Sequence, residues 1–116
     1  MLVILMSSIV FAQIEKKPKA YIFAEVGKAS NAEVKKQFDD FYKKLKNDND
    51  SQGYIINYGT AKEIAKREKQ IRDSINCFDD DLPRLTLVRG GNKEKLKSVF
   101  WIVPNGAEPP TPSNIK

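Results

Sequence analysis

Histidine is absent from this chain, and cysteine occurs only once, at Cys77. Without histidine the chain lacks the side chain that ordinarily titrates near neutral pH and the commonest protein ligand of zinc. A single cysteine can form no disulfide within the chain and is too few for a metal cluster. We therefore expect a binding protein and not an enzyme, with no catalytic residues, no metal site and no cofactor.

Acidic residues are too few to balance the basic ones, since 15 Asp and Glu face 20 Lys and Arg and leave a net charge of +5. The length of 116 residues, with 41% hydrophobic and 30% charged residues, fits one small domain with its own core. A basic excess suits nucleic acid, an anionic membrane surface or an anionic polymer outside the cell. Charge alone leaves these partners open.

Long hydrophobic runs are also lacking, apart from one at the start of the chain. "MLVILMSSIVFAQ" is uncharged and ends in small residues near Ala12, which resembles a secretory signal peptide. A transmembrane helix needs about 20 apolar residues, and this run meets charge at Glu15. We expect residues 1–12 to be removed, a mature start at Gln13 without a membrane span, and a periplasmic or secreted protein. The alternative is that the run is a buried strand or helix.

The remaining chain alternates between strand and helix patterns. Strands are predicted at 20–27, 53–59, 84–91 and 95–104 from aromatic and β-branched runs, and helices at 30–46 and from Thr60 onward from apolar residues at helical spacing. The order βαβαββ predicts an α/β domain over residues 13–104, with a mixed four-stranded sheet and two helices. The strand at 53–59 should be central and parallel to the third. The predicted core includes Phe38, Phe41, Ile55, Ile71, Leu87 and Phe100.

Turn sequences and the end of the chain complete this organisation. "FDDDLP" and "GGNKE" are predicted turns before and after the third strand, and the second is short enough to reverse the chain into the fourth. The prolines of residues 105–116 cannot sustain a strand ladder, so we expect a flexible, extended tail.

The passage "GYIINYGTAKEIAKREKQIRDSI" joins a predicted strand directly to a helix. Thr60 and Glu63 have the spacing of a capping box, in which each side chain bonds the backbone of the other residue. At about 100° per residue, the isoleucines of this helix form one apolar stripe. Arg67 and Glu68 lie at its two flanks, where Glu63 and Arg72 are their respective partners at i,i+4 spacing. On this interpretation the junction is a corner with ordinary surface ion pairs.

The element order, "NDNDSQGYIINYGT" and "KREKQIRDSI" resemble the OmpA-like domains, the peptidoglycan-binding family of the outer-membrane protein A C-terminus, over residues 20–104. "LVRGGN" and "FWIVPNGAEPPTP" are similar to a divergent exported branch. The resemblance implies that Arg67 binds the carboxylate of the diamino acid in a peptidoglycan stem peptide, with Thr60 and Glu63 beside it. The family's aspartate has no counterpart, because Ala61 and Lys62 follow Thr60, and Glu63 is the candidate replacement.

These observations predict an exported, non-catalytic binding module of the cell envelope that contacts the peptidoglycan stem peptide through Arg67, Thr60 and Glu63. The alternative is an adaptor that keeps the OmpA-like scaffold, has lost the peptidoglycan pocket and binds an envelope protein through its sheet edge or tail. A cytosolic nucleic-acid binder ranks third, because it requires the leader to be structural. We therefore expect no nucleic-acid partner.

Overall fold

The computed structural model describes residues 18–48, 50–75, 84–91 and 95–112. Several predictions made from the sequence lie outside this part of the chain. These are the signal peptide at 1–12 with the mature start at Gln13, Cys77, the turn at 78–83, most of the turn after the third strand and the end of the tail.

The described chain follows the predicted order β-α-β-α-β-β, which confirms the fold class. Each helix begins at a capping box, and the period of the apolar residues changes where each helix begins. The elements are β1 (Tyr21–Val26), α2 (Asn31–Asn47), β2 (Gln52–Tyr58), α3 (Ala61–Ile75), β3 (Leu85–Gly91) and β4 (Lys97–Val103).

The four strands form one mixed sheet in the order β1-β4-β2-β3. β2 is central and parallel to β3, as predicted, and pairs on its other side with β4 in antiparallel orientation. β4 also pairs antiparallel with β1. β4 runs in the opposite direction to β3, as the predicted reversal of the chain requires, but it lies on the far side of β2 and does not pair with β3.

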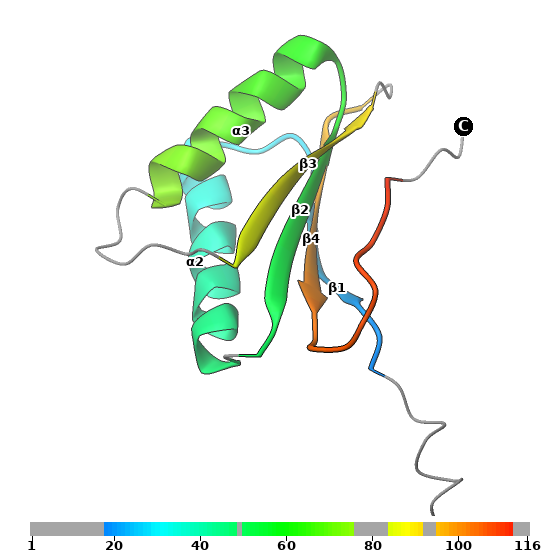
Figure 1. Cartoon of the computed structure of the whole chain (residues 1–116). Coiled ribbons are helices and arrows are strands. Elements are labelled where there is room, and N and C mark those ends of the chain that lie inside the picture. The colour runs from blue at the N-terminus through cyan, green and yellow to red at the C-terminus, as the bar shows by residue number, and fades with distance from the viewer. Residues whose placement is uncertain (1–17, 49, 76–83, 92–94, 113–116) are drawn as a thin grey trace, which may run out of the picture.

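Both helices cover the same face of the sheet (Figure 1). Their apolar stripes meet β2 and β4 in the main core, where the rings of Phe41 and Phe100 pack edge to face with centroids 5.1 Å apart. Of the predicted core residues, Leu87 is half-buried against this cluster and the others are fully buried. The main core consists of Val34, Phe38, Phe41, Tyr42, Leu45, Ile55, Ile71, Phe100 and Ile102.

The opposite face of the sheet carries a smaller apolar cluster. Ile56, Tyr58 and Val99 are buried there, and Val88 and Trp101 pack against them. No helix covers this side in Figure 1, but the segment at 104–112 turns back after β4 and runs along it. The sheet therefore has one face closed by helices and another that lies beside the chain's own extended segment.

Candidate functional site

The junction between β2 and α3 is a tight corner with a capped helix. Gly59 has a φ of 139°, a backbone conformation that side-chain-bearing residues rarely adopt. The Thr60 hydroxyl accepts from the Glu63 N–H at 3.1 Å, and the Glu63 carboxylate accepts from the Thr60 N–H at 3.0 Å. The predicted capping box is therefore confirmed, and these two polar side chains bond the backbone at the start of α3.

Arg67 is turned into the molecule and is only 1% exposed. Its Nη1 donates to the Val26 carbonyl at 3.3 Å and to the Ser98 hydroxyl at 2.7 Å. Nη2 donates to the Gly27 carbonyl at 2.6 Å, and Nε donates to the Gln70 side-chain oxygen at 2.9 Å. The guanidinium thus ties α3 to the end of β1 and to the start of β4.

A buried polar chain continues from Arg67 into the sheet. The Ser98 hydroxyl, which accepts from Arg67, donates to Asn57 Oδ1 at 2.5 Å. Asn57 and Ser98 face each other across β2 and β4 and are both 0% exposed. Asn57 Nδ2 has no hydrogen-bond partner among the described residues. The side-chain oxygens on this chain point toward the positive charge, which is the orientation that stabilises a buried cation.

The charge of Arg67 is balanced by dipoles instead of an acid. Among the residues that the structure describes, no carboxylate lies within ion-pair distance of its guanidinium, and Glu63 is not its partner as the i,i+4 spacing predicted. Burial lowers the pKa of Arg67, although an arginine remains protonated at neutral pH. The two backbone carbonyls, the hydroxyl and the amide oxygen take the place of water around it.

The three residues of the predicted ligand site do not converge on one exposed surface. Thr60 is exposed and Glu63 half-buried at the start of α3, whereas the Arg67 side chain lies inside the fold. For Arg67 to reach the carboxylate of a stem peptide, its guanidinium would have to leave the carbonyls of Val26 and Gly27. Contact between these three residues and peptidoglycan stays a prediction.

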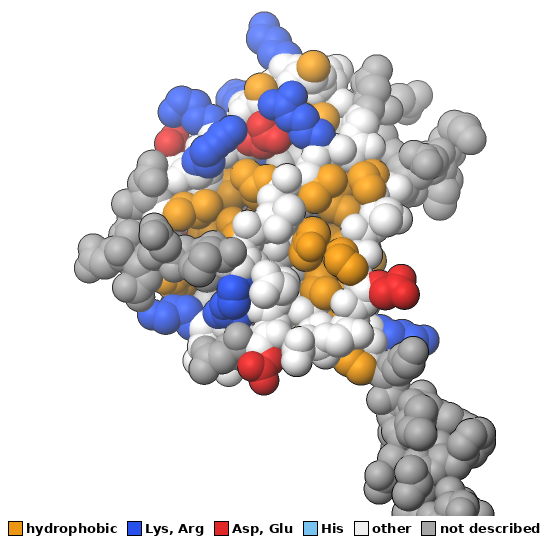
Figure 2. Space-filling view, in the orientation of Figure 1, with side chains coloured by type: hydrophobic (Ala, Val, Ile, Leu, Met, Phe, Trp, Pro, Cys, Tyr) orange, Lys and Arg blue, Asp and Glu red, His pale blue; other side chains and the backbone are white. Residues whose placement is uncertain are grey.

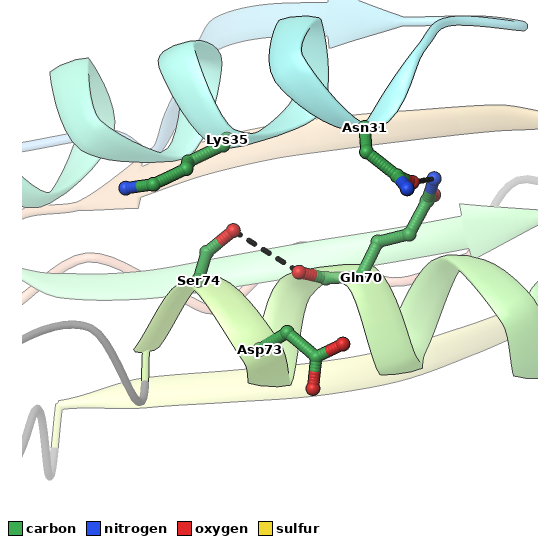
Figure 3. Close-up of a pocket in the computed structure, with 5 residues that line it drawn as sticks. All are labelled: Asn31, Lys35, Gln70, Asp73 and Ser74. Atoms are coloured by element: carbon green, nitrogen blue, oxygen red, sulfur yellow. Dashed lines mark hydrogen bonds between the residues drawn. The ribbon is translucent and has the colours of Figure 1, made fainter.

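A groove between α2 and α3 lies at the outer end of the Arg67 network. Gln70, which accepts from Arg67, donates to Asn31 Oδ1 on α2, and the Ser74 hydroxyl donates to the Gln70 carbonyl at 3.0 Å (Figure 3). The groove has a volume of about 210 Å³ and is also lined by Lys35 and Asp73. It is smaller than ordinary ligand pockets of about 300–1,000 Å³. The side-chain amides of Gln70 and Asn31 bond each other across this groove, so the contact joins α3 to α2.

Glu68 forms the second polar link between α3 and the sheet. Its side chain is only 8% exposed, and its two carboxylate oxygens accept from Arg89 Nε and Nη2 at 3.0 and 2.8 Å. Arg72, the predicted partner, has its Nη2 3.5 Å from Glu68 Oε1. The hydrogen bonds from Arg89 lower the pKa of Glu68 and outweigh burial, which raises it. The ion pair with Arg72 is confirmed, but the main partner is Arg89.

Arg84 is a further structural arginine that the sequence interpretation missed. Its Nη1 donates to the carbonyls of Asp48 and Ser51 at 2.9 and 2.6 Å, and Nη2 donates to the Leu45 carbonyl at 2.7 Å. A cation at the carboxyl end of a helix stabilises the unpaired carbonyls and the negative end of the helix dipole. Because Arg89 alternates with Leu85 and Leu87 along β3, the sequence places its side chain on the same face of the sheet as these leucines, which is the face that the helices cover. Nothing local in the sequence predicts that Arg84 bonds the carbonyls at the end of α2.

Comparison of the chain with protein-family models, with curated proteins and with solved structures finds no match. The resemblance to OmpA-like domains therefore stays a prediction carried by the quoted residues. Within the described residues, no helix has the length and apolar character to cross a membrane, and no group of three or more acidic or cysteine side chains is placed to hold a metal ion.

Proposed function

We propose that this chain is an exported, non-catalytic adaptor of the cell envelope, with an OmpA-like scaffold that binds another protein. The burial of Arg67 favours a protein partner over the stem peptide. The Arg67 guanidinium, which the resemblance assigns to the stem-peptide carboxylate, is 1% exposed and donates to Val26, Gly27, Ser98 and Gln70 within the fold. The arginine therefore serves the scaffold.

The chemistry of the described polar groups supports a non-catalytic role. A general acid or base works best with a pKa near the operating pH. The pKa of Glu68 is shifted downward, away from neutral pH, by its hydrogen bonds with Arg89. Arg67, the other buried charged side chain among the residues that the structure describes, is held by four hydrogen bonds inside the fold. Both residues have a structural explanation that requires no reaction.

Photo-crosslinking in the native envelope tests the adaptor proposal. A photoreactive amino acid is placed at the exposed positions Lys36 on α2, Lys66 on α3 and Thr86 on β3, one at a time. We expect a protein adduct of defined mass from at least one position in cells. We expect no muropeptide adduct when the same purified chains are mixed with peptidoglycan at about 0.3 M salt, where non-specific charge attraction is screened. Adducts to muropeptides alone, or no adduct from any position, would contradict the proposal.

Export is tested separately by the mass of the native protein. The apolar run at 1–12 motivates removal during export, so protein purified from the envelope or the medium should begin at Gln13. Intact-mass spectrometry measures this directly. A mass that retains residues 1–12 would contradict a cleaved signal peptide.

A further inference from the structure

β3 is an edge strand whose outer side has no partner strand among the described residues. It lies at one end of the sheet order and pairs only with β2. Its seven residues, Leu85–Gly91, contain neither proline nor lysine, the residues that commonly protect an edge from pairing. In Figure 1 β3 passes in front of β2, and Figure 2 shows hydrophobic side chains on both sides of a pale strip along this edge.

The register shows which backbone groups of β3 point outward. Gly53 pairs with Leu85, and the Gly53 N–H donates to the Arg84 carbonyl at 2.7 Å, so Arg84 directs its carbonyl toward β2. Backbone groups alternate in direction along a strand, and in a parallel ladder every second residue bonds the same neighbour. The N–H and carbonyl groups of Leu85, Leu87 and Arg89 therefore point away from β2, toward the open side.

Two arginines give this edge a positive charge. Arg89 and Arg72 flank the Glu68 carboxylate, and their side chains are 60% and 56% exposed. One buried carboxylate thus faces two guanidinium groups, which leaves an excess positive charge at the surface. A further carboxylate is favoured at this position, while a lysine is repelled.

The other sheet edge is less suited to a new strand. Both edge strands have one irregularity in register, and such bulges disrupt pairing at an edge. In β1 it falls inside the strand, between Ile22 and Ala24, whereas in β3 it comes after Arg89 and leaves the register regular from Leu85 to Arg89. A second copy of this chain is also a poor partner for β3, because edge-to-edge pairing would bring the exposed Arg89 side chains of both copies to one interface.

We propose that the outer edge of β3 binds an extended, acidic segment of a partner protein. The segment adds to the sheet as a new strand, bonds the outward backbone groups of Leu85, Leu87 and Arg89, and places a carboxylate beside Arg89 and Arg72. Backbone bonds of this kind give affinity, while the charge selects among extended segments. This inference rests on the proposed adaptor function and assigns its binding surface.

Amide hydrogen exchange, followed by NMR on the full exported chain, tests the edge residue by residue. The probes are two end-blocked peptides in which valine and threonine alternate with glutamate in one and with lysine in the other. The glutamate peptide should slow exchange at Leu87 and Arg89 at least tenfold, leave the already bonded amides of Thr86 and Val88 unchanged, and bind more tightly than the lysine peptide. Protection at neither residue, equal binding of both peptides, or self-association through β3 would overturn the proposal.

A matched pair of variants separates strand addition from simple charge attraction. Arg89→Ala and Arg89→Pro both remove the ion pair with Glu68, but only proline removes the outward N–H. We expect Arg89→Pro to bind the glutamate peptide at least tenfold more weakly than Arg89→Ala. Equal affinities would contradict strand addition. If Arg89→Pro does not fold, the exchange pattern of the wild-type chain still decides the question.

The crosslinking experiment distinguishes failure of this inference from failure of the adaptor proposal. Protein adducts from Lys36 or Lys66, with no adduct from Thr86 and no peptide protection of β3, would leave the adaptor standing and exclude this edge. Absence of protein adducts from all three positions would contradict the adaptor itself. Adducts from Thr86, together with protection of the Leu87 and Arg89 amides, would support both the adaptor function and the binding of an acidic segment at the edge of β3.

Discussion

The Arg67 guanidinium holds three segments of the chain together. It bonds the carbonyls of Val26 and Gly27 after β1, the hydroxyl of Ser98 on β4, and the amide of Gln70 on its own helix. A planar fork of donors can reach acceptors in several directions, which a lysine ammonium on a flexible stem cannot reproduce. The geometry of these hydrogen bonds therefore requires an arginine at this position.

Replacing Arg67 should destabilise the fold. We expect Arg67→Met to lower the free energy of unfolding by about 3 kcal/mol, because hydrogen bonds to a charged group are lost and buried carbonyls are left unpaired. Arg67→Lys should recover less than half of this loss. Urea denaturation followed by circular dichroism measures both. The control Arg72→Met removes an arginine that is 56% exposed and should change stability by less than about 0.5 kcal/mol. Equal effects of the two Met variants would contradict the structural role.

Glu68 should contribute stability that depends on pH. Its folded-state pKa is lowered, mainly by hydrogen bonds from Arg89, below the usual value of 4.5. The stabilisation is therefore fully present above about pH 4.5 and is lost as the pH falls through the lower, folded pKa. Glu68→Gln should lower Tm at pH 7, and the difference from wild type should shrink below pH 4.5. Thermal melts across this range measure it, with Glu25→Gln as a control at a half-exposed ion pair. A constant difference across this range would contradict the interpretation.

At the scale of the elements, α2 packs closely against β2 at a glycine. A Cβ built on Gly53 would lie 2.7 Å from Leu45 Cδ1 and 2.9 Å from Phe41 Cζ, and both side chains are fully buried. These atoms are held by the surrounding core and cannot move aside freely. The absence of a side chain at Gly53 therefore sets the distance between helix and sheet.

Adding a methyl group at this contact should separate the two elements. We expect Gly53→Ala to cost about 1–3 kcal/mol of unfolding free energy, as overpacking of a core does. Gly27→Ala is the matched control, since its Cβ would meet only the Leu96 carbonyl at an ordinary 3.7 Å. Denaturant unfolding of both variants measures the effect. If neither Gly53→Ala nor Gly27→Ala changes the free energy of unfolding, the close contact of α2 with β2 at Gly53 would be contradicted.

The elements themselves could be predicted because their signals are local. Capping boxes at Ser30 and Thr60, helical stripes and the continuous apolar run of β2 gave the order and the central strand. The insertion of β4 between β1 and β2 could not be predicted, because pairing partners are distant in sequence. The burial of Arg67 could not be predicted either, since a flank position on a helical wheel does not show which carbonyls of another strand can bind the side chain.

At the scale of the whole molecule, the sheet leaves different surfaces for different partners. The helices close one face, the extended segment at 104–112 lies along the other, and β3 forms an edge beside two exposed arginines. The net charge of +5 adds a general attraction to anionic polymers. Such attraction weakens with salt, whereas recognition through buried hydrogen bonds persists.

The central claim is that Arg67 serves the fold and that the chain does not recognise peptidoglycan through it. Co-sedimentation of the full exported chain with purified peptidoglycan, measured as salt is raised, tests this most directly, with soluble stem peptide as competitor. The account predicts retention only at low salt and no displacement by the stem peptide. Retention should be lost completely by about 0.3 M salt, where the Debye length is roughly 6 Å, compared with about 10 Å at 0.1 M. Retention that survives this salt and is displaced by the stem peptide would contradict the account.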